Sequence, residues 1–240
     1  MAKKQRNYNR RYPYEYNIFR TIFYMCFIYV VVIPFLKVFY NFKITGKENL
    51  PTKAKSGKFI YTANHVSHFD PPFVSMACMR PIAYMAKKEL FEKGDKFEFL
   101  VKRLGAFAVD RTKPELATFK TVRDILATSW SLGVFPQGGI RPYGKLEGIK
   151  KGFVVIAKNA KADIIPVAIA DWDGYPKLKP FTRRNVNIRI GKPISYKLAE
   201  DEIIYEWCRQ ISELANYENG AALPESYNCL LYTSPSPRDR

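Results

Sequence analysis

Histidine and cysteine are both scarce in this chain of 240 residues. The only histidines are His65 and His68, and no second cluster of histidines or cysteines stands ready to complete a metal's coordination shell. The four cysteines, at positions 26, 78, 208 and 229, form no Cys-x-x-Cys pair and no regular framework. This usage indicates a reducing, cytosol-facing compartment, and it excludes a small secreted domain held together by disulfides.

Acidic residues are also in short supply, with 22 Asp and Glu against 39 Lys and Arg and a net charge of +17. A surface with this imbalance attracts anionic partners, which include nucleic acids, anionic lipid headgroups and phosphorylated substrates. The chain contains no RNA- or DNA-binding signature such as the aromatic motif of RRM domains or a paired-cysteine zinc finger. We therefore expect no nucleic-acid partner and favour an anionic membrane surface or a phosphorylated substrate.

An apolar run of the length that a membrane-spanning helix needs is missing as well. Residues 21–36 are sixteen residues without a charge, which is short of the roughly 20 that span a bilayer. They follow a segment, residues 1–20, with six basic side chains, one acid and several interleaved tyrosines. Basic residues attract anionic headgroups, and tyrosines favour the boundary between water and lipid. The pattern predicts that residues 1–41 anchor the protein to a membrane.

The orientation of this anchor follows from the charge and the cysteines. If the basic end stays in the cytosol, one full crossing would place the remaining domain outside, against the cysteine usage. We therefore predict a helix, bent or paired at Pro34, that embeds in one leaflet or re-enters on the same side, with the remaining domain on the cytoplasmic face. The alternative is an ordinary buried helix of a soluble domain.

Both histidines lie in one polar stretch between a strand and a helix. Residues 58–63 are β-branched and aromatic enough to form a buried strand, and Asp70-Pro71-Pro72 is a helix start with Asp at the cap. His65 and Asp70 thus fall between a strand end and a helix start, where α/β folds place chemistry. An imidazole near its ordinary pKa can take a proton at neutral pH, and a carboxylate on its other nitrogen fixes the tautomer. Two other interpretations remain: ordinary loop histidines, or a metal site of His65, His68 and Asp70.

The pattern Asn64-His65-x4-Asp70 resembles the first motif of the glycerolipid acyltransferases, and most closely that of the lysophosphatidic acid acyltransferases. The resemblance implies that His65 is a general base and that Asp70 orients it. It also implies that no metal and no bound cofactor take part.

A second block runs from Gly105 to Arg111, with a strand-like apolar core. It resembles the family's Gly-x5-Arg motif, in which the arginine binds the glycerol phosphate. A guanidinium suits that role because it offers planar, paired donors and is always charged. Taken alone, Arg111 could equally be a solvated arginine at a strand end.

The third block is Phe135-Pro136-Gln137-Gly138-Gly139-Ile140-Arg141, after a buried strand at 131–136. It is similar to the family's Phe-Pro-Glu-Gly-Thr-Arg motif with two departures: Gln137 replaces the usual Glu, and the arginine comes one position later. Glycines allow a backbone to approach a phosphate closely. We therefore assign phosphate binding to Gly138 and Arg141.

Two further features complete the resemblance. Lys150 belongs to a basic step into a helix at 153–160, and we add it to the phosphate-binding residues. The strand at 162–169 carries Pro166, which the family also has in this strand. Because a proline removes a ladder hydrogen bond, we expect Pro166 at a sheet edge or a bulge, with a role in shape.

The order of elements predicts an α/β domain with a mixed, largely parallel sheet of about seven strands flanked by helices. We divide the chain into an anchor (1–41), a catalytic domain (42–227) and a tail (228–240) that resembles read-through of adapter sequence and is set aside.

The family resemblance implies transfer of an acyl group from acyl-CoA or acyl carrier protein to the free hydroxyl of lysophosphatidic acid (1-acylglycerol 3-phosphate), giving phosphatidic acid. Relatives that use glycerol 3-phosphate or a lysophospholipid as acceptor are barely separated by these motifs. A non-catalytic basic protein that binds membranes or nucleic acid is the alternative from another class.

Overall fold

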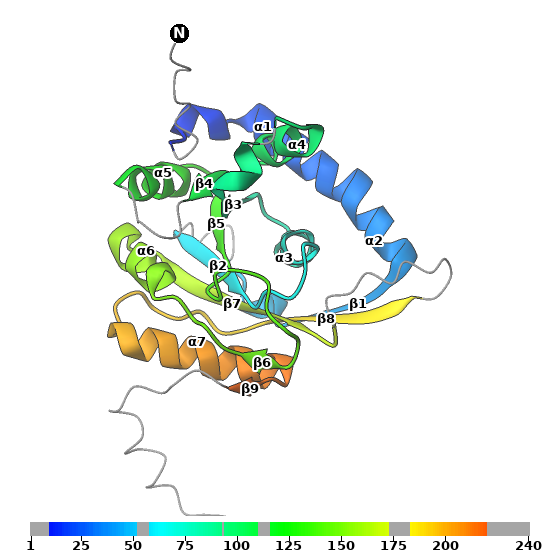
Figure 1. Ribbon diagram of the computed structural model, residues 1–240, viewed down its shortest axis with the longest axis vertical. Coiled ribbons are helices and arrows are strands. Elements are labelled where there is room, and N and C mark those ends of the chain that lie inside the picture. Colours follow the sequence, from blue (N-terminus) through cyan, green and yellow to red (C-terminus); the bar gives the residue numbers. More distant parts are fainter. Residues whose placement is uncertain (1–9, 52–57, 93, 110–115, 173–182, 220–240) are drawn as a thin grey trace, which may run out of the picture.

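The computed structural model describes residues 10–51, 58–92, 94–109, 116–172 and 183–219 (Figure 1). Its main strands are β1 (Tyr40–Thr45), β2 (Phe59–Ala63), β3 (Ile82–Lys87), β4 (Phe107–Val109), β5 (Ser131–Val134), β7 (Asp163–Ala170) and β8 (Arg184–Ile190). They form one sheet in the order β1-β8-β7-β2-β5-β3-β4, and every neighbouring pair is parallel except β7 and β8. The prediction of a largely parallel sheet of about seven strands is confirmed.

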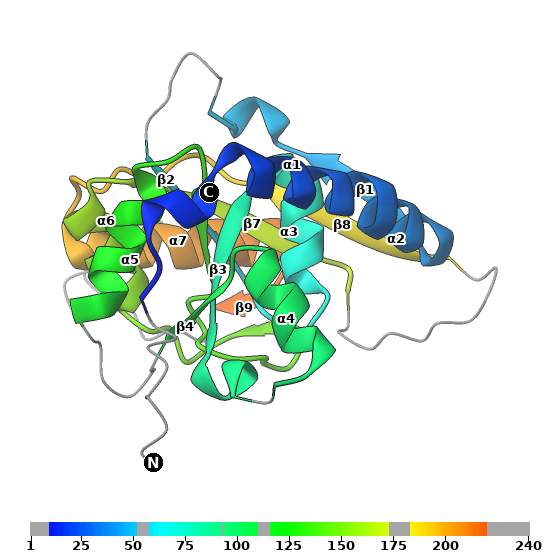
Figure 2. The same ribbon diagram turned by 90° about the horizontal axis from the view of Figure 1, so that it is seen from above.

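Helices cover both faces of this sheet. They are α1 (Ile18–Cys26), α2 (Ile33–Phe39), α3 (Asp70–Cys78), α4 (Lys96–Arg103), α5 (Leu116–Leu126), α6 (Gly152–Ala160) and α7 (Glu200–Ala215). Figure 1 shows α3 and the α1–α2 segment on one side of the sheet and α7 on the other, where α6 packs against it. Seen from above, in Figure 2, the α1–α2 segment crosses in front of α3 and runs beside β1.

The burial of each strand explains its place in the sheet. β2 and β7 are buried at nearly every position, which is typical of parallel strands covered by helices on both faces. β1 and β8 alternate between buried and more exposed positions, so one of their faces is left less covered. β2 is central, between β7 and β5, and the polar loop that carries both histidines leaves from its carboxyl end.

Pro166 lies inside the sheet, in β7, with a strand on either side. The regular ladder to β8 begins at the pair of Val167 with Ile190, and the next bridge joins Ile164 to Ile194. Between these two pairs the chain advances three residues in β7 and four residues on the β8 side. Pro166 lies in this irregular stretch. A bulge-like interruption, and not an edge, accommodates its missing N–H.

The apolar N-terminal helix is longer than the sequence predicted. It runs without a break from Ile18 to Phe39, 22 residues that include an 18-residue window with a mean hydropathy of 2.3, and it is long and apolar enough by length and composition to cross a membrane. Of the two arrangements predicted at Pro34, a bent helix or a pair of helices, the continuous helix excludes the pair. Wider, π-type turns at Phe27–Val32 precede this proline, which cannot donate a backbone hydrogen bond.

One stripe of this helix packs on the domain and the rest is exposed. Tyr24, Ile28 and Leu36 join the main hydrophobic core, whereas Phe19 is 80% exposed and Val30 is 71% exposed. The predicted boundary between residues 41 and 42 falls inside β1, so anchor and domain share both a strand and a core.

Candidate active site

His65 and Asp70 form a hydrogen-bonded pair in the loop between β2 and α3. The distance from His65 Nδ1 to Asp70 Oδ2 is 2.7 Å, and the same oxygen accepts the backbone N–H groups of Val66 (2.7 Å) and Ser67 (2.8 Å). The Asp70 side chain is fully buried, and 13% of the His65 side chain is exposed. The carboxylate is therefore fixed inside the protein while the imidazole reaches the surface.

Asp70 does not serve as the helix cap that the sequence predicted. It is the first residue of α3, Phe69 takes the cap position, and no side chain makes a capping bond there. Its carboxylate instead turns back to the loop amides that precede it. Burial raises the pKa of Asp70, and the hydrogen bonds from His65, Ser67 and Val66 act against this shift.

This pairing sets what His65 can do. When Asp70 is ionised, its carboxylate accepts a hydrogen bond from the Nδ1–H of His65. The Nε2 atom then keeps its lone pair for the proton of an incoming hydroxyl. His68 is exposed, and in the described part of the chain no three His, Cys, Asp or Glu side chains come together as a metal site would need.

Asn64 fixes the loop to the neighbouring strand β7. Its side chain donates to the carbonyl of Ile169 (2.9 Å) and accepts from the Ile169 amide (2.8 Å), as a backbone neighbour would. Asn64 Nδ2 also lies 3.3 Å from the hydroxyl of Tyr217, a residue that the sequence analysis did not single out. The side chain is fully buried, so its role here is to hold the loop in place.

The turn at 135–141, which follows β5, is tied to the histidine loop from the other side. The His65 amide donates to Gln137 Oε1 (2.8 Å), and the Arg141 amide donates to the His65 carbonyl (2.8 Å). Gln137 is 1% exposed, and its Nε2 is buried without a hydrogen-bond partner. His65 is thus held at both its amide and its carbonyl by one turn.

The basic side chains expected to bind phosphate lie over two glycines with positive φ. A Cβ atom on Gly138 (φ +66°) would lie 3.3 Å from Lys150 Cγ, and one on Gly148 (φ +69°) would lie 3.1 Å from Arg141 Nη2. The Lys150 amide also donates to the carbonyl of Pro136 (2.8 Å). The structure therefore places Gly138 and Arg141 on the turn that holds His65, and Lys150 lies against this turn.

Two aromatic rings support the imidazole. His65 stacks on Phe135 with ring centroids 4.2 Å apart, and Phe135 stacks on Tyr84 at 5.9 Å. Phe135 was expected only as part of a motif, and Tyr84 was not expected in the site. An apolar–polar alternation in a strand gives no sign of which ring will lie under a histidine.

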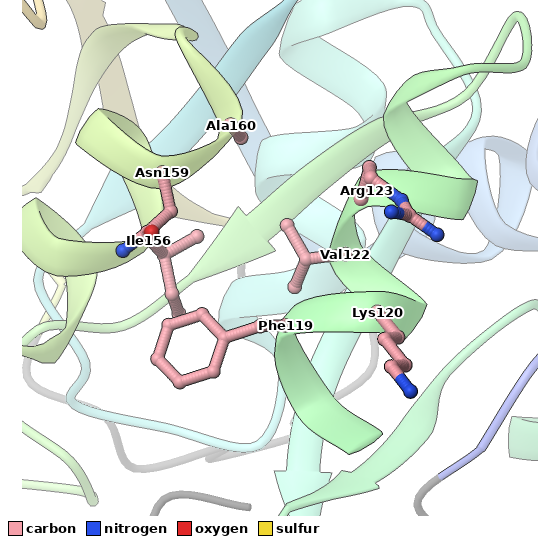
Figure 3. Close-up of a pocket in the computed structure, with 7 residues that line it drawn as sticks. All are labelled: Phe119, Lys120, Val122, Arg123, Ile156, Asn159 and Ala160. Carbon is pink, nitrogen blue, oxygen red and sulfur yellow. The ribbon is translucent and has the colours of Figure 1, made fainter. Parts of the chain in front are cut away.

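The second predicted block is only partly described. Gly105 has φ +84°, and a Cβ atom there would lie 2.4 Å from the ring of Trp130, so this glycine is required by packing. Arg111 lies outside the described residues. A separate pocket of about 170 Å³ opens between α5 and α6, where Phe119 and Ile156 face each other (Figure 3). None of the predicted site residues lines it.

Comparison with known proteins identifies what this geometry belongs to. The family model described as "Acyltransferase" matches residues 41–170. The chain is 33% identical over 153 residues to the 1-acyl-sn-glycerol-3-phosphate acyltransferase of Bacillus subtilis, a match that takes in 63% of this chain and 73% of that protein. The chain belongs to the acyltransferase family.

A second relative agrees with this placement, and a solved structure shares the fold. The pneumococcal 1-acyl-sn-glycerol-3-phosphate acyltransferase is 33% identical over 57% of this chain, and the match covers half of that protein. The fold is that of the crystal structure of the 1-acyl-sn-glycerophosphate (LPA) acyltransferase PlsC from Thermotoga maritima, with a TM-score of 0.60, 23% identity and 79% coverage of each chain.

Family membership and the apolar helix together support association of this acyltransferase with a membrane. The helix supplies a largely exposed apolar surface, which is how a protein can be held in the bilayer interface.

Proposed function

We propose that this acyltransferase moves an acyl group from a thioester donor to the free hydroxyl of 1-acylglycerol 3-phosphate, forming phosphatidic acid for phospholipid biosynthesis. The observation that carries the proposal is the His65–Asp70 pair, 2.7 Å apart, at the carboxyl end of the central strand. The relatives of this chain in Bacillus subtilis and Streptococcus pneumoniae are named 1-acyl-sn-glycerol-3-phosphate acyltransferases.

The reaction follows from the placement of His65. Its Nε2 takes the proton of the acceptor hydroxyl as the hydroxyl oxygen attacks the carbonyl carbon of the thioester. The tetrahedral intermediate then collapses, the C–S bond breaks, and the imidazolium returns the proton to the leaving thiolate. Asp70 stabilises the imidazolium through Nδ1 and keeps the ring in one tautomer.

The acceptor phosphate is assigned to the basic groups around the glycine turn. Arg141 and Lys150 supply positive charge there, and Arg111 joins them in the proposal by its motif. In the described part of this turn, the Gly138 and Arg141 amides already donate to Phe135 and His65 carbonyls. The amides of Gly139 and Ile140 therefore remain as candidates to stabilise the oxyanion or the phosphate.

We further propose that the donor is acyl-CoA or acyl carrier protein, and that the protein works on an anionic membrane surface with its catalytic domain on the cytoplasmic face. The net charge of +17 favours such a surface.

The direct test is a transfer assay with purified protein, both donors, and lysophosphatidic acid, glycerol 3-phosphate and a neutral lysophospholipid as acceptors. We expect phosphatidic acid from the first acceptor and loss of product in His65→Ala. Tight, salt-sensitive nucleic-acid binding without turnover on any acceptor would overturn the proposal.

A further inference from the structure

Two hydroxyl groups meet at the carbonyl of Pro71, the residue that follows Asp70 in α3, and a third bonds to one of them. Ser75 Oγ donates to this oxygen across 2.8 Å, and the Tyr84 hydroxyl donates to it across 2.9 Å. The Tyr24 hydroxyl donates to Ser75 Oγ across 2.7 Å. Each hydroxyl has one proton to give, and this arrangement uses all three.

Tyr84 belongs to β3, and its ring lies over the backbone of β5. A Cβ atom on Gly133 would lie 2.4 Å from two ring carbons of Tyr84, so the glycine makes room for the ring. The ring stacks on Phe135 with an interplanar angle of 18°, and Phe135 stacks on the His65 imidazole at 24°. Tyr84 therefore supports His65 from below through Phe135.

Tyr84 is thus linked to both His65 and Asp70, each through one intervening residue. Its ring reaches the support of His65, and its hydroxyl reaches the first turn of the helix that begins with Asp70. Burial raises the pKa of Tyr84, so the hydroxyl remains protonated and can donate throughout the neutral range. Tyr24 and Ser75 are 2% and 3% exposed, so water cannot readily replace a lost bond here.

We propose that Tyr84 is a positioning residue that keeps His65 and Asp70 in register for acyl transfer, and that Tyr24 links this control to the apolar N-terminal helix. The inference rests on the proposed function. Tyr84 acts through Phe135 and Pro71, so its loss is expected to affect the chemical step more than substrate binding. Displacing a catalytic group by about 1 Å can cost about 10²-fold in rate.

The first experiment compares Tyr84, a partly buried tyrosine of β3, with Tyr61, a buried tyrosine of the neighbouring part of the sheet. Tyr84→Phe removes a bonded hydroxyl, and Tyr61→Phe is its matched control because the Tyr61 hydroxyl is buried without a hydrogen-bond partner. In steady-state assays with lysophosphatidic acid we expect Tyr84→Phe to lower kcat by about tenfold or more, with KM for donor and acceptor nearly unchanged. Tyr61→Phe should retain the wild-type kcat.

A matched pair on the N-terminal helix tests the link to the membrane segment. Tyr24→Phe should lower kcat by about two- to tenfold, the equivalent of one hydrogen bond. Tyr29→Phe is the control, since Tyr29 is 39% exposed on the same helix. Equal kcat values for Tyr24→Phe and Tyr29→Phe would show that the N-terminal helix does not influence catalysis through Tyr24.

A second readout does not depend on turnover. The chain has two histidines, so in a His68→Gln background the NMR signals of labelled histidine belong to His65 alone. Its ring protons lie over the Phe135 ring and carry a ring-current shift. Tyr84→Phe should move these signals, whereas Tyr61→Phe should not.

The outcomes separate the two claims. Absence of transfer by the wild type would overturn the proposed function, and the NMR comparison would still decide whether Tyr84 positions His65. A Tyr84→Phe variant that matches Tyr61→Phe in kcat or in the His65 signals overturns the positioning role. So does a rise confined to KM. If Tyr84→Phe fails to fold, Ser75→Ala removes the shared hydroxyl hub without touching the ring and takes its place.

Discussion

The backbone amide of His65 donates to the side-chain oxygen of Gln137 across 2.8 Å. An oxygen must face this N–H, so the orientation of the Gln137 amide is fixed, and its Nε2 is left buried without a partner. Position 137 therefore needs an acceptor for the histidine loop, and a neutral amide supplies it as a carboxylate would. The replacement of the family's usual Glu by Gln keeps this bond.

The first prediction follows from that bond. Gln137→Ala leaves the His65 amide buried without an acceptor, which costs about 1–3 kcal/mol in unfolding free energy, and we expect a large loss of kcat as the loop shifts. Gln137→Glu keeps an acceptor and should retain much more activity. Thermal unfolding and steady-state kinetics measure both effects. Equal activity in the two variants would show that the bond does not matter for catalysis.

The second prediction concerns the proposed base. His65→Ala should lower kcat by about 10²–10⁴-fold, the usual worth of general-base catalysis, with little change in stability because the ring is at the surface end of its loop. His68→Ala is the matched control from the same loop, exposed to solvent, and should be nearly silent. A larger loss of kcat in His68→Ala than in His65→Ala would show that His65 is not the base.

The histidine loop could be located from the sequence because its signals are local. A β-branched strand, a polar loop and two prolines at a helix start are adjacent in the chain, so β2 and α3 were predicted nearly in place. The true partners of Asp70 could not be predicted. A carboxylate at a helix start can bond forward to the helix or back to the loop, and the backbone path decides between them.

Long-range contacts account for what else was missed. Tyr84 is 51 residues along the chain from Phe135, and only the β3–β5 pairing brings their rings together. Tyr217 reaches Asn64 because β9 (Glu218–Asn219) pairs with β6 (Lys145–Leu146), two short strands with no sequence signal of their own. The shared core of the N-terminal helix was hidden for the same reason, since Tyr24 and Leu36 read simply as members of an apolar run.

The third prediction uses the ionisation of Asp70. Because burial raises its pKa in the folded state, the folded protein binds this proton more tightly than the unfolded chain does. The contribution to stability is therefore present at low pH and is lost as pH rises through the interval from the ordinary pKa of Asp, about 3.9, to the raised one. The Asp70→Asn variant does not lose stability in this way, because an asparagine side chain does not ionise.

Asp70→Asn should thus gain stability relative to wild type as pH rises across that interval, while losing activity at every pH because tautomer control is gone. Urea unfolding of both proteins from about pH 4 to 8 checks the first part. A stability difference that stays constant with pH would mean that Asp70 is ionised to the same extent in the folded and unfolded states.

The fourth prediction addresses the assignment of Arg111 to the acceptor phosphate. Arg111→Ala should raise KM for lysophosphatidic acid much more than KM for the acyl donor, because it removes a charge-assisted contact. Arg183→Ala, at another basic position, is the control. Equal effects of Arg111→Ala on both substrates would assign the arginine to the donor or to the structure.

The last prediction tests how the N-terminal helix holds the membrane. Removing residues 1–41 would also strip Tyr24 and Leu36 from the core, so substitutions on the exposed face are the cleaner test. Phe19→Ser and Val30→Ser change the side chains that are 80% and 71% exposed, and they should leave thermal unfolding unchanged. If these side chains lie in lipid, each loss removes about 1.5–3 kcal/mol of transfer free energy, or roughly tenfold or more in vesicle partitioning.

Sedimentation with anionic vesicles measures this loss, and Leu198→Ser, at an apolar side chain 39% exposed away from the helix, is the control. Wild-type protein should stay bound in high salt, because an embedded apolar face is not screened as surface charges are. Full release of the wild type by salt alone would mean that the basic residues hold the protein at the surface. Unchanged vesicle binding of the double variant Phe19→Ser/Val30→Ser would show that this face of the helix does not contact the membrane.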